Sequence, residues 1–170
     1  MDIKAIKTEL AGMFATLFNL DPLTGLPTAQ PMRANAQAPM SIAETDLPTW
    51  ILFTGGAVYP TPPDQTVDRL SKETRDFQCC LYVMLQTAGI DGEAERRVEP
   101  YIDYARNLIQ SHPLLYDGNI SDRVPGIMRA YVVRDEGIVV LPYGNPVQKY
   151  DGLRFTIRVE GLNMVTYGNE

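Results

Sequence analysis

The sequence predicts a single α+β domain: a mostly antiparallel sheet with two main helices packed on one of its faces. Three observations favour this class. Residues 153–159 alternate between apolar and polar side chains, two segments have apolar residues at helical spacing, and two more segments near the C-terminus have strand patterns. The 170 residues suit one ordinary domain, so we expect a single domain over residues 1–170.

The first predicted element is a helix over about Ile3–Phe18, capped by Asp2. A proline-rich stretch follows, because residues 20–65 hold eight of the 13 prolines, which forbid a long helix. We expect an extended arm or long loop at about residues 20–47. The sequence leaves open whether this arm wraps a neighbouring molecule or folds back on its own domain.

Two strands come next, over Leu47–Gly56 and Glu73–Leu85. In the second strand, Phe77, Cys79 and Leu81 lie on one face and are apolar. The opposite face is only partly polar, which is typical of a strand that is covered on that side as well. We therefore expect something to pack on both faces of this strand.

The second helix is predicted with its packed part over Pro100–Gln110, because proline suits a first helical turn better than an interior. A three-stranded meander should follow. Its expected turns are a hairpin at residues 135–137 (Asp-Glu-Gly) and a second turn within residues 144–152. In the last strand, Gly161 shifts the apolar phase and predicts a bulge.

The sequence contains few of the residues that metal sites and nucleophilic catalysis require. One histidine and two adjacent cysteines are too few for a zinc site, and the nearest approach to a calcium loop, residues 117–122, is incomplete. A thiol enzyme using Cys79 or Cys80 with His112 is the remaining candidate, but Cys79 lies on an apolar strand face. We expect a protein that is not an enzyme and has no metal or cofactor.

Charge and hydropathy indicate which partners and which cellular compartment to expect. A net charge of −6 disfavours binding to nucleic acid phosphates, which requires a basic patch. No apolar run approaches the roughly 18 residues of a membrane span, and the first residues are amphipathic and unlike a signal peptide. We expect synthesis in a cytoplasm and no membrane partner.

The order of these segments resembles a known family. An amphipathic helix, the strands "DLPTWILF" and "TRDFQCCLYVML", the helix around "PYIDYARNLIQSHPLLYDG" and a final strand "GLRFTIRV" together resemble the tail terminator (tail completion) proteins of long-tailed bacteriophages. The resemblance covers most of the chain. It implies a ring of usually six subunits that docks on the last layer of tail tube protein, stops tube growth and meets the head–tail connector, while DNA passes through without specific binding.

If the resemblance holds, the protein is a virion component at the tail–neck junction, made in the host cytoplasm, and its function lies in loops. We expect contacts from two loops, residues 54–65 and 143–152. Tyrosines beside turns are either loop anchors or interface contacts, and both readings stay open. The candidate interface residues are Tyr59, Pro60, Pro62, Pro63, Tyr143, Asn145, Pro146 and Tyr150, and the candidate acids of the ring lumen are Asp64, Asp68 and Glu73.

Three alternatives remain at this stage. The nearest is another neck protein, a head–tail connector or a minor tail protein. The second is an acidic binding module outside any virion, which a well-formed apolar pocket with convergent polar groups would favour. The third is the thiol enzyme.

Overall fold

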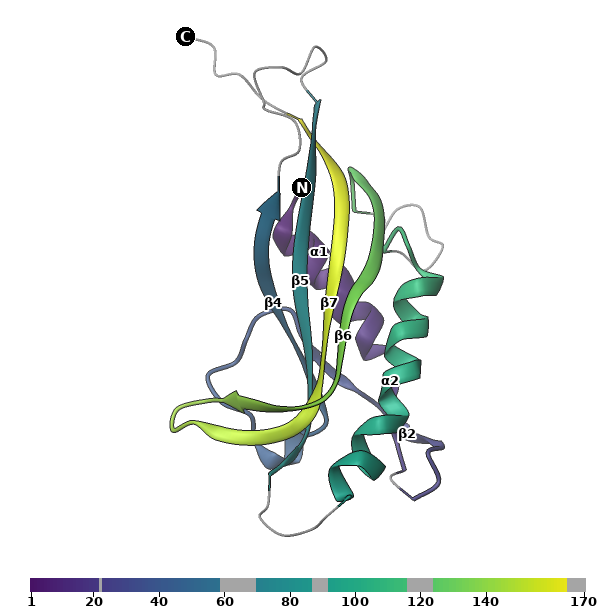
Figure 1. Ribbon diagram of the computed structural model, residues 1–170, viewed down its shortest axis with the longest axis vertical. Coiled ribbons are helices and arrows are strands. Elements are labelled where there is room, and N and C mark those ends of the chain that lie inside the picture. Colours follow the sequence, from purple (N-terminus) through teal and green to yellow (C-terminus); the bar gives the residue numbers. More distant parts are fainter. Residues whose placement is uncertain (22, 59–69, 87–91, 116–123, 165–170) are drawn as a thin grey trace.

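The computed structural model is an α+β fold, as the sequence predicts (Figure 1). It describes residues 1–21, 23–58, 70–86, 92–115 and 124–164. The elements are α1 (Ile3–Ala15), β1 (Phe18–Leu20), β2 (Pro27–Pro31), β3 (Arg33–Asn35), the 3₁₀ helix η1 (Glu44–Asp46), β4 (Thr49–Val58), β5 (Leu70–Leu85), α2 (Glu93–Ser111), β6 (Ile127–Tyr143) and β7 (Gln148–Met164).

The main sheet has five strands in the order β3-β4-β5-β7-β6. All neighbours are antiparallel except β3 and β4. Helix α1 packs against β3 and β4, and α2 packs against β6 and β7, so the two helices cover one face side by side (Figure 1). Strands β1 and β2 form a separate two-stranded hairpin.

Helix α1 begins where the sequence predicts and ends earlier. The Asp2 carboxylate accepts hydrogen bonds from the backbone N–H groups of Lys4 (2.9 Å) and Ala5 (3.1 Å). The helix ends at Ala15, and the Thr16 hydroxyl donates to the Met13 carbonyl (2.6 Å). The predicted extension to residue 18 is wrong because Phe18 is already paired with the facing strand β2.

The layer between the helices and the sheet is the main core. Leu153, Phe155, Ile157 and Val159 of β7 are each at most 1% exposed, which confirms the predicted strand and its buried face. Trp50 of β4 is fully buried and stacks against the ring of Phe14 at 4.2 Å and against the ring of Phe155 at 6.3 Å between centroids. Burial of the four β7 side chains is worth about 6–12 kcal/mol as an upper bound.

The opposite face of the sheet is covered in part by the arm of the same chain. A second apolar cluster lies there, and it includes Ile51, Cys80 and Tyr82 together with Ile42 from the arm. The phenol hydroxyl of Tyr150 donates to the Ile42 carbonyl (3.4 Å). The arm therefore folds back onto its own domain, and the expected cover on the second face of β5 is confirmed.

The expected hairpin at residues 135–137 is wrong. Strand β6 runs through these residues without turning and pairs with β7 on both sides of them. Asp135 and Gly137 form a bulge instead, in which the Gly137 N–H donates to the Asp135 carboxylate (2.8 Å) and Gly137 has φ +65°. Pairing with β7 on both sides of these residues overrides their local preference for a turn. The true turn connects β6 and β7 at residues 144–147, inside the second predicted turn.

The packed part of the second helix begins earlier than expected. Helix α2 begins at Glu93 and Pro100 lies inside it, with Val98 buried before the proline. The acceptor that Pro100 leaves without its helical donor is the carbonyl of Arg96, a residue on the exposed side of the helix.

The bulge expected at Gly161 lies in the neighbouring strand. Pairing of β7 with β5 is continuous through Gly161, whereas β6 is irregular between Ile127 and Arg129. A Cβ on Gly161 would lie 2.6 Å from the Gly126 carbonyl oxygen. The glycine therefore permits a close backbone approach rather than a bulge.

Candidate functional surfaces

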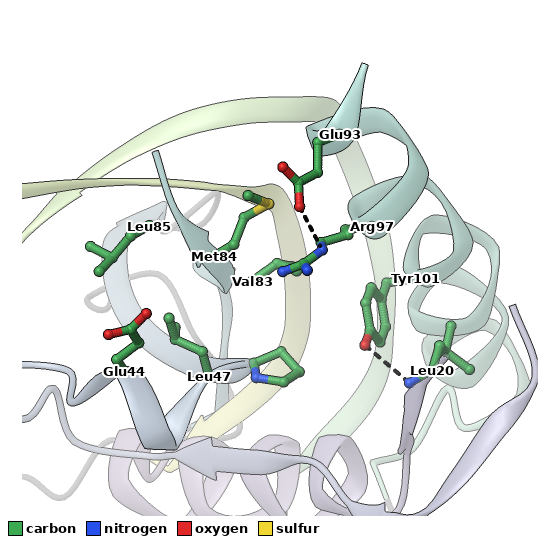
Figure 2. Close-up of a pocket in the computed structure, with 10 residues that line it drawn as sticks. Leu20, Glu44, Leu47, Val83, Met84, Leu85, Glu93, Arg97 and Tyr101 are labelled. Atoms are coloured by element: carbon green, nitrogen blue, oxygen red, sulfur yellow. Dashed lines mark hydrogen bonds and ion pairs between the residues drawn. The ribbon is translucent and has the colours of Figure 1, made fainter. Parts of the chain in front are cut away.

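A pocket of about 580 Å³ lies between the end of β5, the start of α2 and the arm (Figure 2). We call it the α2 pocket. Its size falls in the range of small-ligand and side-chain binding sites. It is lined by Leu20, Glu44, Leu47, Pro48, Val83, Met84, Leu85, Glu93, Arg97 and Tyr101.

The α2 pocket combines an apolar lining with a few polar groups. Arg97 forms an ion pair with Glu93 (3.2 Å), and the Tyr101 hydroxyl accepts a hydrogen bond from the Leu20 N–H (3.0 Å). Burial raises the pKa of the Tyr101 phenol, so this group stays neutral. Glu44 forms no ion pair with any residue that the structure describes. Such a site suits a ligand that places an apolar group in the pocket and a polar or cationic group beside it.

The end of the β6–β7 hairpin is the second surface. We call residues 144–149 the hairpin tip. In Figure 1 the hairpin extends beyond the helices, on the side of the sheet away from α2. Of the predicted interface residues, Asn145 and Pro146 lie here and are exposed, and Val147 beside them is 69% exposed.

Tyr143 and Tyr150 hold this end of the molecule in place. Tyr143 donates its hydroxyl proton to the Pro39 carbonyl. The ring of Tyr82 meets the ring of Tyr143 at 5.2 Å and that of Tyr150 at 5.6 Å, both edge to face. The expectation that Tyr150 lies at an interface is wrong, since it is only 1% exposed. For both tyrosines the loop-anchor interpretation describes what the side chain does.

Glu73 does not fit the role of an acid lining a lumen, because it is 2% exposed. Its carboxylate accepts hydrogen bonds from the Met1 amino group (3.0 Å) and from Arg75 (2.9 and 3.1 Å). Burial by itself raises the pKa of this carboxyl, but the hydrogen bonds and charges of Met1 and Arg75 outweigh it and hold the pKa below its ordinary value. Glu73 is a structural acid.

The part of the outer sheet face not covered by the arm carries paired charges. Arg158 of β7 binds Asp76 of β5 through two bonds (2.8 and 3.0 Å). Glu160 accepts from Arg129 (2.8 and 3.1 Å) and from the Tyr131 hydroxyl (2.6 Å), and these bonds lower its pKa. Because acids and bases alternate and pair, these residues do not form a surface of one sign.

The two thiols are poor nucleophiles. Cys79 is fully buried and Cys80 is 2% exposed. Burial raises the pKa of both thiols, and the neighbouring Cys80 raises the pKa of Cys79 further. A reactive cysteine requires the opposite shift, towards thiolate at neutral pH.

Metal-ligand clusters and membrane-spanning helices are both absent from the described residues. No group of three or more potential metal ligands gathers among the described residues. Within the same ranges, no helix is both long and apolar enough to span a membrane.

Several predicted site residues lie outside the described residues. They are Tyr59, Pro60, Pro62, Pro63, Asp64 and Asp68. Conversely, sequence reasoning missed the α2 pocket altogether. Glu44, Val83 and Arg97 come from three distant segments, and no local pattern marks them as neighbours.

The comparisons with known proteins add no relative. No family model matches the chain, and a search of curated proteins finds no match.

Proposed function

We propose that the protein is a structural virion component that assembles into a ring. The ring binds one end of a phage tail tube and caps it. The proposal rests on the order of its segments, which resembles that of tail terminator proteins, and on the α+β fold that this resemblance implies. The observation that carries it is the hairpin tip. It projects beyond the helix layer with exposed apolar residues, while Tyr143 and Tyr150 fix its base.

The proposed mechanism is one-sided complementarity. One surface of a ring, usually of six copies, matches the tube end, and the other surface offers the head–tail connector its binding site. Several weak contacts made together give a tight cap because each contact raises the effective concentration of the next. DNA passes through the ring, and the net charge of −6 favours passage without adhesion. No catalytic step, metal or cofactor takes part.

The test is tube growth. Purified tail tube protein is allowed to polymerise with increasing amounts of this protein, and tube lengths are measured by electron microscopy. Amounts far below one per tube subunit should shorten the tubes, because only ends are bound. Unchanged lengths at equimolar protein would overturn the proposal. Binding to a connector protein without any effect on tubes would instead identify another neck protein.

A second candidate function, an acidic binding module outside any virion, is favoured by one observation. The α2 pocket is the apolar site with convergent polar groups that such a module needs. Native mass spectrometry of the protein purified from its own host decides this. A bound small molecule that is lost in Arg97→Gln would support the module. An empty pocket in every preparation would remove it.

A further inference from the structure

We propose that the hairpin tip of one copy docks in the α2 pocket of the next copy. This inference rests on the proposed ring and names the contact that builds it. The tip and the pocket lie on different parts of the same protomer, so each copy donates one contact and accepts another. Such a head-to-tail contact generates a closed ring when its rotation closes.

The apolar surfaces are complementary. Val147 at the tip is 69% exposed, and Met40 is 94% exposed on the arm, whose backbone lies about 4 Å from where a Cβ of Gly144 would stand. Single exposed apolar residues are common, but here the arm that carries Met40 lies against the start of the hairpin tip that carries Val147. The pocket offers the matching concave lining through Leu47 and Val83. Docking removes both surfaces from water.

The charges are complementary as well. Lys149 is exposed on the hairpin beside Val147 and forms no ion pair with the residues that the structure describes. Glu44 on the pocket rim is likewise exposed and without a described ion-pair partner. Two opposite charges that lack described ion-pair partners, one on each apolar surface, attract the surfaces to one another and fix their orientation.

The tip is also held ready for docking. The Tyr143 hydroxyl donates to the Pro39 carbonyl. The Tyr150 hydroxyl has one proton to donate and two acceptors within reach, the Gln148 side-chain oxygen (2.7 Å) and the Ile42 carbonyl (3.4 Å). A segment already fixed in its bound shape loses little conformational entropy on binding. The hairpin extends away from α2 in Figure 1, so it serves a neighbour's pocket rather than its own.

The outer edge of β6 is the competing route to assembly, and its geometry argues against strand addition there. Pairing of β6 with β7 is irregular at three places, between Ile127 and Arg129, between Val132 and Arg134, and between Asp135 and Ile138. Bulges on an edge strand disrupt the regular row of backbone groups that another chain would need. A side-chain contact through the tip therefore suits this molecule better than strand addition.

Sedimentation of matched variants tests the contact without any tube protein. Val147→Asp should raise the dissociation constant for self-association about tenfold or more, because a charge enters an apolar site. Val133→Asp, the same change on the exposed β6 edge, should leave it unaltered. Lys149→Glu and Glu44→Lys should each weaken association about threefold, and the double variant should restore it. Loss of association in Val133→Asp alone would overturn the proposal.

Cross-linking tests the contact between hairpin tip and α2 pocket even where association is weak. Val147→Cys and Glu44→Cys proteins are mixed and treated with a short bis-maleimide, and Val133→Cys mixed with Glu44→Cys is the control. The native thiols are buried and do not compete. Preferential formation of the Val147–Glu44 linked dimer supports the contact, and equal yields from both mixtures refute it. A protein that forms this dimer yet never shortens tubes would retain the contact and lose the tube-capping function.

Discussion

Replacing Glu73 by Gln tests whether this acid is structural. The change keeps the shape of the side chain and removes its charge. The Met1 amino group and the Arg75 guanidinium then lose the anion that both of them bind, and these two side chains are 0% and 16% exposed. A lumen acid exposed to solvent would tolerate the same change without loss of stability.

The structure sets the size of the effect. Removing one partner of a buried ion pair costs about 3–5 kcal/mol, and the partial exposure of Arg75 places the expected loss near the lower limit, about 3 kcal/mol. For a domain of this length, that corresponds to a fall in melting temperature of roughly 6–12 °C. Glu95→Gln is the matched control, because Glu95 is exposed on α2 and should change stability by less than about 0.5 kcal/mol.

The pH dependence supplies an independent readout. The pKa of Glu73 is lowered in the folded protein, so its contribution to stability is fully present above the unfolded pKa of about 4.3 and is lost as the pH falls through the folded value. The free energy of unfolding in urea should therefore change less between pH 7 and pH 3 in Glu73→Gln than in the native protein. Equal stability of the variant and native protein at pH 7 would refute the assignment.

Three further predictions concern the sheet and the arm. Gly152→Ala should leave little folded protein by circular dichroism, because the new Cβ would lie 1.9 Å from the Leu81 carbonyl oxygen. Trp50→Ala should lower the free energy of unfolding in urea by about 3–5 kcal/mol. Trp50→Phe should cost clearly less, because it keeps an aromatic ring and removes only an indole N–H that has no hydrogen-bond partner among the described residues. Tyr150→Phe should cost about 1 kcal/mol and speed limited proteolysis of the arm near Ile42.

Patterns that repeat over several residues predicted the fold well. The alternation through Phe155 and Ile157 identified the central strand and its buried face, and the helical spacing through Ile6 and Leu10 identified α1. The second apolar face of β5 correctly indicated a cover on both sides, as Cys80 shows. These signals succeed because burial on one face imposes its period on the sequence itself.

Signals carried by one or two residues failed more often. The turn residues at 135–137 became a bulge because pairing with β7 continues on both sides. The packed part of α2 did not begin at Pro100, since Val98 before it is buried and the hydrogen bond lost at the proline lies on the exposed side of the helix. Burial of Glu73 had no local signature, since its partner Met1 lies 72 residues away. The α2 pocket was beyond sequence reasoning for the same reason.

Imaging of tube ends is the most direct test of the proposed function. Tubes grown from tail tube protein are incubated with this protein carrying a gold label and viewed by electron microscopy. The proposal predicts a ring of label at one end of each tube and none along its sides. Label spread along the tubes, or tubes with bare ends beside free monomers, would contradict it.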